Sequence, residues 1–220
     1  MRLPRRRRPL APDRGTLVLG GVAASAVIAV VATEVGRVWR RGKAPLPQEA
    51  ESVILAAEEA VAETAEVAIA GYQHVSKREN ALFNMLTSFA GTFLIVRWVT
   101  YLLRERKHVG PFRNVRLGRR HIHHFVPGIA LAFGSGAGGI LLRDERVDPL
   151  LAVPFGVGLG LTLDESALLL ELDDVYWSHE GLLSVQITLA VMALLGGLAL
   201  ALRFLRRGEA VVLEAAPAAA

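Results

Sequence analysis

Two apolar stretches of the chain read FVPGIALAFGSGAGGILL (residues 125–142) and PLLAVPFGVGLGLTLDESALLLEL (residues 149–172). Only the short charged turn RDERVD separates them. A helix needs about 20 mostly apolar residues to cross the hydrocarbon core of a bilayer, and both stretches are close to that length. Because the turn is so short, the second helix must return beside the first. The two stretches therefore predict a membrane-spanning helical hairpin.

Three further apolar runs of similar length lie at residues 16–38, 81–103 and 182–205. The first could instead be a cleaved signal peptide, with Val30 and Ala32 at the cleavage site. Its length, and the lack of small polar residues after it, favour an uncleaved anchor. The sequence thus predicts an all-α, polytopic transmembrane bundle of about five spans, with a four-span core at 81–205.

The segment 44–80 differs from these runs in composition. It begins with Pro45 and Pro47, and residues 48–72 are rich in alanine and glutamate. Each glutamate would cost about 3 kcal/mol inside a bilayer, so this is not a span. Apolar residues recur at helical spacing and predict an extramembrane amphipathic helix. It could lie on the membrane, pair with a partner helix or be a solvated linker. The apolar stripe consists of Ile54, Ala57, Val61, Ala65 and Ala68.

Charge and composition narrow the classes of function. The chain is 52% hydrophobic, carries a formal charge of +4 and has no cysteine, which excludes disulfides and cysteine-ligated zinc. Basic residues gather in the arm 1–15 and in the segment 104–120, both next to spans. Such clusters favour a cytoplasmic N-terminus and contacts with anionic lipid headgroups. No nucleic-acid-binding motif accompanies them, so we expect no nucleic-acid partner. The tail 206–220 is predicted to be disordered.

Histidines and carboxylates frame the hairpin. Three histidines precede its first helix, and carboxylates end its second, so both groups should lie on one side of the membrane. Imidazole and carboxylate groups together are typical ligands of zinc, iron or manganese. Headgroup contacts and a solvated helix end are the plainer interpretation. The predicted ligands are His121, His123, His124, Glu171, Asp174 and His179.

Ionisable residues also occur deeper within the apolar runs. Arg97 lies in the second run, and Asp164 and Glu165 lie in the fourth. Charged groups inside membrane segments are expensive and by default indicate function, although Arg97 could pair with an acidic residue purely as structural support. Gly156 and Gly160 form a small-xxx-small pair, which lets two helix backbones approach closely. We expect this pair to tighten the hairpin.

The block LTLDESALLLELDDVYWSHEG (residues 161–181), preceded by the histidine-rich start of a span, resembles an uncharacterised family of actinobacterial integral membrane proteins. The resemblance covers residues 119–185 and leaves out the N-terminal span and the Ala/Glu helix. It implies a membrane location and no established activity. Together with the spans, it predicts a multi-pass protein of the bacterial cytoplasmic membrane.

Three hypotheses of function follow from these patterns. The first is a metal-dependent membrane enzyme, such as a hydrolase that acts on a lipid through metal-activated water. The second is an ion- or proton-path protein built on Arg97, Asp164 and Glu165. The third is a scaffold that binds a partner through the Ala/Glu helix. The residues alone do not decide whether the protein is an enzyme.

Overall fold

The computed structural model describes residues 14–105, 116–117, 120–121, 124–164 and 179–213. Its regular structure is helical except for one short antiparallel strand pair, β1 (Arg116–Leu117) and β2 (Arg120–His121). Its helices are α1 (Arg14–Arg41), α2 (Val53–Gln73), α3 (Lys77–Glu105), α4 (Phe125–Leu142), α5 (Asp148–Asp164) and α7 (His179–Val212).

Three of the described helices are long and apolar enough to cross a membrane: Gly20–Arg41, Lys77–Val99 and Phe125–Leu142. Many of their large apolar side chains point outward; Ile28 is 68% exposed and Phe133 is 76% exposed. Such a surface is stable in lipid but not in water, because lipid avoids the cost of hydrating apolar atoms. The predicted span 149–172 is described only as far as Asp164, and the count of five spans stays a prediction.

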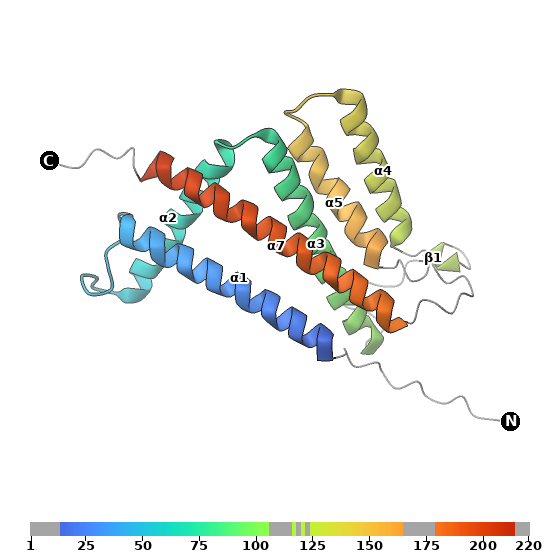
Figure 1. Cartoon of the computed structure of the whole chain (residues 1–220), viewed down its shortest axis with the longest axis horizontal. Coiled ribbons are helices and arrows are strands. Elements are labelled where there is room, and N and C mark those ends of the chain that lie inside the picture. The colour runs from blue at the N-terminus through green and yellow to red at the C-terminus, as the bar shows by residue number, and fades with distance from the viewer. Residues whose placement is uncertain (1–13, 106–115, 118–119, 122–123, 165–178, 214–220) are drawn as a thin grey trace.

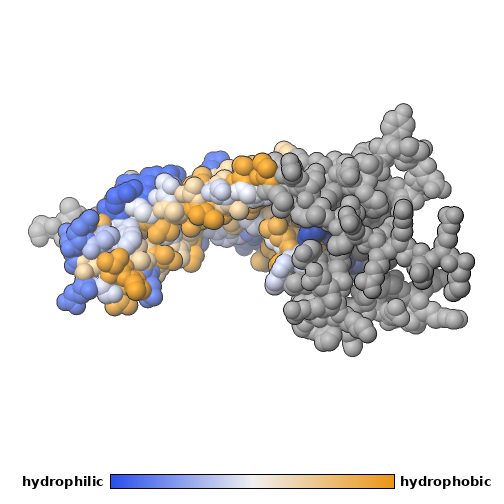
Figure 2. Space-filling model, turned by 90° about the horizontal axis from the view of Figure 1, so that it is seen from below, coloured by the Kyte–Doolittle hydropathy of each residue, from blue (hydrophilic) through white to orange (hydrophobic). Residues whose placement is uncertain are grey.

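The long helices lie side by side in the order α4, α5, α3, α7 and α1, and α2 crosses the ends of α7 and α1 (Figure 1). On the face shown in Figure 2, apolar residues cover much of the described part, whereas hydrophilic residues gather mostly toward the α2 end. A small apolar core joins α3 to α7 and is built on Phe89, Ala90 and Ala193.

Glycines bring α5 against both of its neighbours. A side chain at Gly156 would collide with Ser88 and the carbonyl of Met85 on α3, and a Cβ atom at Gly160 would lie 2.9 Å from Thr92 of the same helix. The expectation that Gly156 and Gly160 tighten the α4–α5 hairpin is therefore wrong, since they face α3. Residues two positions apart lie on nearly opposite sides of a helix. It is Gly158 that faces α4, where a Cβ atom would lie 2.6 Å from the carbonyl oxygen of Gly128.

The last helix is longer than its apolar run. α7 continues to Val212, so the predicted disordered tail is wrong for residues 206–212. Two glycines explain the continuation, because Gly208 lies against the backbone of Val67 and Gly71 lies against the backbone of Phe204. This close crossing of α2 and α7 holds the end of α7 in helical form.

The start of α3 has a local explanation in the sequence. Ser76 and Glu79 form a reciprocal cap: the backbone N–H of Glu79 donates to Ser76 Oγ at 3.3 Å, and the backbone N–H of Ser76 donates to the Glu79 carboxylate at 3.1 Å. This arrangement satisfies two of the backbone donors that a helix start leaves unpaired. Arg203 of α7 also contacts Glu79, with 2.9 Å between Nε and Oε1.

Candidate functional site

Three charged or titratable side chains meet at one end of α3, α4 and α5. Asp164 is the last residue of α5, Arg97 lies near the end of α3, and His124 immediately precedes α4. The antiparallel turn between α4 and α5 brings the start of one helix beside the end of the other. The ionic triad, as we name Arg97, Asp164 and His124, is therefore assembled from positions far apart in the chain.

Asp164 is the centre of the ionic triad. Its Oδ1 lies 2.9 Å from Arg97 Nη2, and its Oδ2 lies 3.3 Å from His124 Nε2. The Asp164 side chain is only 3% exposed, whereas those of Arg97 and His124 are 38% and 30% exposed. A carboxylate is costly to bury unless a charged group or hydrogen-bond donors compensate it. Arg97 and His124, which are both more exposed than Asp164, supply that compensation.

Arg97 is held by a second contact. Its guanidinium carbon lies 5.3 Å from the centroid of the Phe93 ring, one helical turn earlier on α3. A cation above an aromatic face is attracted by the negative charge density of the ring. The guanidinium thus contacts both the Phe93 ring and the Asp164 carboxylate. These two contacts hold its positive charge beside the carboxylate.

The charges of the ionic triad have a simple consequence. Arginine stays protonated under all ordinary conditions, so Arg97 and an ionised Asp164 sum to zero. Imidazole is the side chain that most readily exchanges a proton near neutral pH. A proton on His124 would raise the total charge of the triad to +1. Arg97 contacts Oδ1 and His124 contacts Oδ2, so the two side chains share the Asp164 carboxylate.

The triad lies about one bilayer thickness along α3 from a second ion pair. Glu79 and Arg97 differ by 18 positions, which corresponds to about 27 Å along a helix. That length is close to the thickness of a hydrocarbon core, about 30 Å. Because Glu79 pairs with Arg203 near the start of α3, the two ion pairs lie toward opposite ends of this helix.

The structure describes only part of the predicted site. It brings Arg97, Asp164 and His124 together, although sequence reasoning had assigned His124 to a different cluster. Within the described ranges, no three His, Asp or Glu side chains gather closely enough to hold a metal ion. His121 and His179 are described only as backbone positions in β2 and α7. The predicted residues His123, Glu165, Glu171 and Asp174 lie outside the described residues.

A second group of charges, absent from the sequence predictions, joins α1 to α7. The Glu209 carboxylate, with 3% of its side chain exposed, lies 2.7 Å from Arg37, 3.0 Å from Arg41 and 3.3 Å from Arg206. Arg206 also contacts buried Glu34 at 2.7 Å. The sequence could have suggested this group of charges, because residues 34, 37 and 41 share one face of a helix. We name these five residues the arginine cluster.

Two amide side chains, one buried and one half-buried, join α3 to its neighbours at the end opposite the ionic triad. The Nδ2 group of Asn84 donates to the Tyr72 hydroxyl at 3.0 Å and to the Pro149 carbonyl at 2.8 Å. Asn80, which is 1% exposed, donates to the Tyr72 carbonyl at 2.9 Å. In an apolar environment such hydrogen bonds between helices contribute about 1 kcal/mol each. They support α3, which carries Arg97.

Comparisons of the chain with protein-family models, with curated proteins and with solved structures find no match. The candidate function is accordingly inferred from the geometry of the ionic triad.

Proposed function

We propose that this chain is a multi-pass protein of the bacterial cytoplasmic membrane that moves protons or ions, with the ionic triad as its proton-binding centre. One observation carries the proposal: a nearly buried carboxylate is shared between a permanent cation and an imidazole at the edge of an apolar helical layer. Ionisable groups in such a place are rare, paired and characteristic of proton relays.

The proposed mechanism assigns a role to each member of the triad. His124 exchanges the proton, since imidazole is the side chain that most readily does so near neutral pH and this one is partly exposed. Asp164 stabilises the protonated imidazole through the 3.3 Å contact. Arg97 stays beside Asp164, so the buried carboxylate always has a positive partner. Proton arrival and departure at His124 would change the net charge of the triad while both contacts to Asp164 are kept.

Proton flux through reconstituted protein tests this proposal. The full chain, in liposomes that contain a pH-sensitive dye, should conduct protons under an imposed potential faster than protein-free liposomes. His124→Gln should reduce the flux to the protein-free rate, because glutamine keeps a polar side chain but exchanges no proton. Asp164→Asn should do the same, because the protonated imidazole loses its counter-charge.

A matched control separates this effect from general damage. Glu145→Gln removes an exposed ion pair with Arg78, 3.6 Å long, at the far end of α3, and should leave the flux unchanged. Thermal unfolding in detergent shows whether each variant is folded. Parent protein whose flux equals that of empty liposomes would contradict the proposal, as would a folded His124→Gln variant with parental flux.

A divalent-metal centre is the second candidate function. The contact between His124 Nε2 and Asp164 favours it, because carboxylates commonly orient the imidazoles that bind metals. Such a centre would activate water for hydrolysis of a lipid or another membrane-embedded substrate. The proposed metals are zinc, iron and manganese. The ligands proposed beside His124 are His121, His123, Glu171, Asp174 and His179.

Metal analysis of detergent-purified protein distinguishes the two candidates. A metal centre predicts stoichiometric metal after a chelator-free preparation, and His124→Ala should abolish it while membrane insertion is retained. Acidification should release the metal, because imidazole binds metals only in its neutral form. Parent protein that carries no transition metal and takes none up on titration would eliminate this candidate and leave the proton-binding one.

A further inference from the structure

α2 lies against the ends of two long helices. The backbone of its Val67 contacts Gly208 of α7, and its Glu63 carboxylate accepts the backbone N–H of Lys43, just beyond α1, at 3.0 Å. The residues that α2 buries against these neighbours share one face of the helix. They are Ala56, Ala60, Val67 and Gly71.

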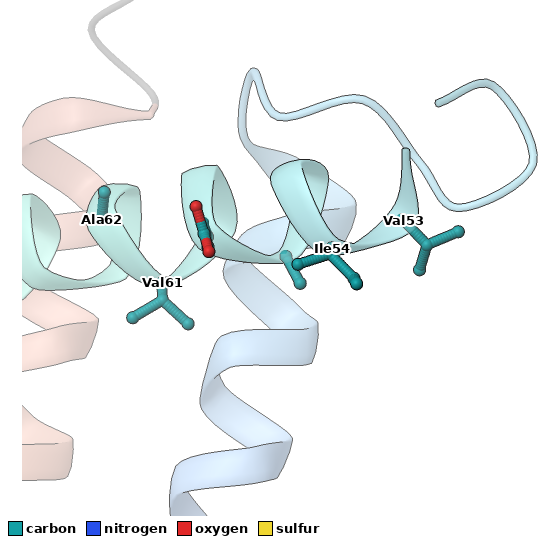
Figure 3. A pocket seen from close by; sticks show the side chains of 6 residues that line it. Val53, Ile54, Val61 and Ala62 are labelled. Carbon is teal, nitrogen blue, oxygen red and sulfur yellow. The ribbon is translucent and has the colours of Figure 1, made fainter. Parts of the chain in front are cut away.

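A second apolar face of α2 is left uncovered in the described structure. Ile54 is 73% exposed, and Val53 and Val61 are each more than half exposed. These side chains line a shallow hollow together with Ala57, Ala62 and the charged Glu58, and Figure 3 shows Val53, Ile54 and Val61 pointing to the side of α2 along which α1 runs. The exposed apolar face is thus directed toward the region that the apolar part of α1 occupies.

The neighbouring charges indicate the depth of α2. The arginine cluster joins the last turns of α1 to the end of α7, and charged groups of this number belong at the edge of a bilayer and not in its apolar core. Trp39 lies at the same end of α1, where its indole N–H donates to the Pro45 carbonyl at 2.8 Å. Tryptophan is enriched at the interface between lipid and water. α2 contacts both helices at this level.

We propose that α2 is an interfacial helix that lies in the plane of the bilayer, with Val53, Ile54 and Val61 among the upper acyl chains beside α1. This inference rests on the membrane placement in the proposed function and not on the ionic triad. The positions of two glutamates agree with this placement. Position 59 lies five residues after position 54, and position 66 lies five residues after position 61. Five residues correspond to a rotation of about 140° around a helix. Glu59 and Glu66 are both exposed and would face water.

The charge of α2 also defines the kind of lipid contact. No lysine or arginine occurs between Lys43 and Lys77, whereas five glutamates lie between residues 51 and 66: Glu51, Glu58, Glu59, Glu63 and Glu66. Amphipathic helices that bind anionic headgroups carry Lys or Arg on their polar face. α2 therefore attaches through its apolar side chains, and its attachment should not require anionic lipid. A soluble protein partner fits this face poorly, because it would have to enter the layer that α1 crosses.

Depth-dependent quenching tests the inference in the full chain, which has no natural cysteine. Ile54→Cys, Val61→Cys, Glu59→Cys and Glu66→Cys are each labelled with a polarity-sensitive fluorophore and reconstituted in phosphatidylcholine vesicles. Nitroxide on the upper acyl chain should quench labels at positions 54 and 61 several-fold more than labels at 59 and 66. All four side chains are exposed, so a label displaces no packed neighbour.

Three outcomes would overturn the inference. Equal quenching at all four positions would mean that α2 is not at the interface. Protection at 54 and 61 that grows with the protein-to-lipid ratio would mean that a second copy covers the face. Quenching that appears only with anionic lipid would mean that headgroup charge holds the helix. None of these results changes the expected proton flux, so failure here and failure of the proposed function are distinguishable.

Discussion

Gly156→Leu is expected to destabilise the protein by at least about 3 kcal/mol, because even the first carbon of the new side chain would collide with Ser88 and with the main-chain carbonyl of Met85. A flexible side chain could move aside, but a backbone carbonyl in a helix cannot move without displacing α3. Since α3 carries Arg97, the variant should also lose the geometry of the ionic triad. Thermal unfolding in detergent and the yield of monodisperse protein measure the effect.

Gly134→Leu is the matched control for this prediction. It introduces the same side chain into the neighbouring helix of the hairpin, at an exposed position where no atom lies within 4 Å of an added Cβ. Its midpoint of unfolding should stay close to that of the parent. If Gly156→Leu unfolds at the parental temperature, the close approach of α3 and α5 is not what holds these helices together.

Glu209→Gln is expected to lower the free energy of unfolding by about 2–3 kcal/mol, because it removes the carboxylate that three arginines share. Breaking a fully buried ion pair costs about 3–5 kcal/mol, but these arginine side chains are 31–43% exposed and water recovers part of the loss. Glutamine keeps the size of the side chain, so the loss reports charge and not a cavity. Chemical or thermal unfolding in detergent measures it.

Two comparisons sharpen this second prediction. Glu145→Gln breaks an ion pair in which both side chains are mostly exposed, and should cost less than about 1 kcal/mol. Combining Glu209→Gln with Arg206→Gln should cost less than the sum of the two single changes, because the repulsion among the remaining arginines falls. Strictly additive losses would show that Glu209 and Arg206 are not coupled.

Together, the ionic triad and the arginine cluster give the molecule two different kinds of charged site. Asp164 has a permanent cation and an imidazole among its partners, so the net charge of this site can change with proton binding. Among the described residues, the ion-pair partners of Glu209 are arginines, and arginine does not lose its proton in proteins. We therefore expect the first site to be functional and the second to hold α1 against α7.

Hydrophobic length by itself determined where the apolar helices lie. The predicted run 125–142 coincides with α4, Phe125–Leu142, because a polar turn and a histidine-rich segment end the apolar stretch on both sides. The Ala/Glu segment was likewise predicted as a helix from its periodicity, and α2 occupies Val53–Gln73 within it. These features depend on residues near in sequence, so they can be derived without knowing which helices are neighbours.

Only the tertiary structure decided which residues meet. The spacing of Gly156 and Asp164 within α5 indicates which face of this helix each residue occupies. It does not indicate that α3 is the neighbour that both residues contact. The same reason explains why Arg206 was assigned to a disordered tail: its partners Glu34 and Glu209 become close only when α7 lies along α1. Contacts between helices distant in sequence are set by the packing of whole surfaces, and local sequence patterns do not contain that information.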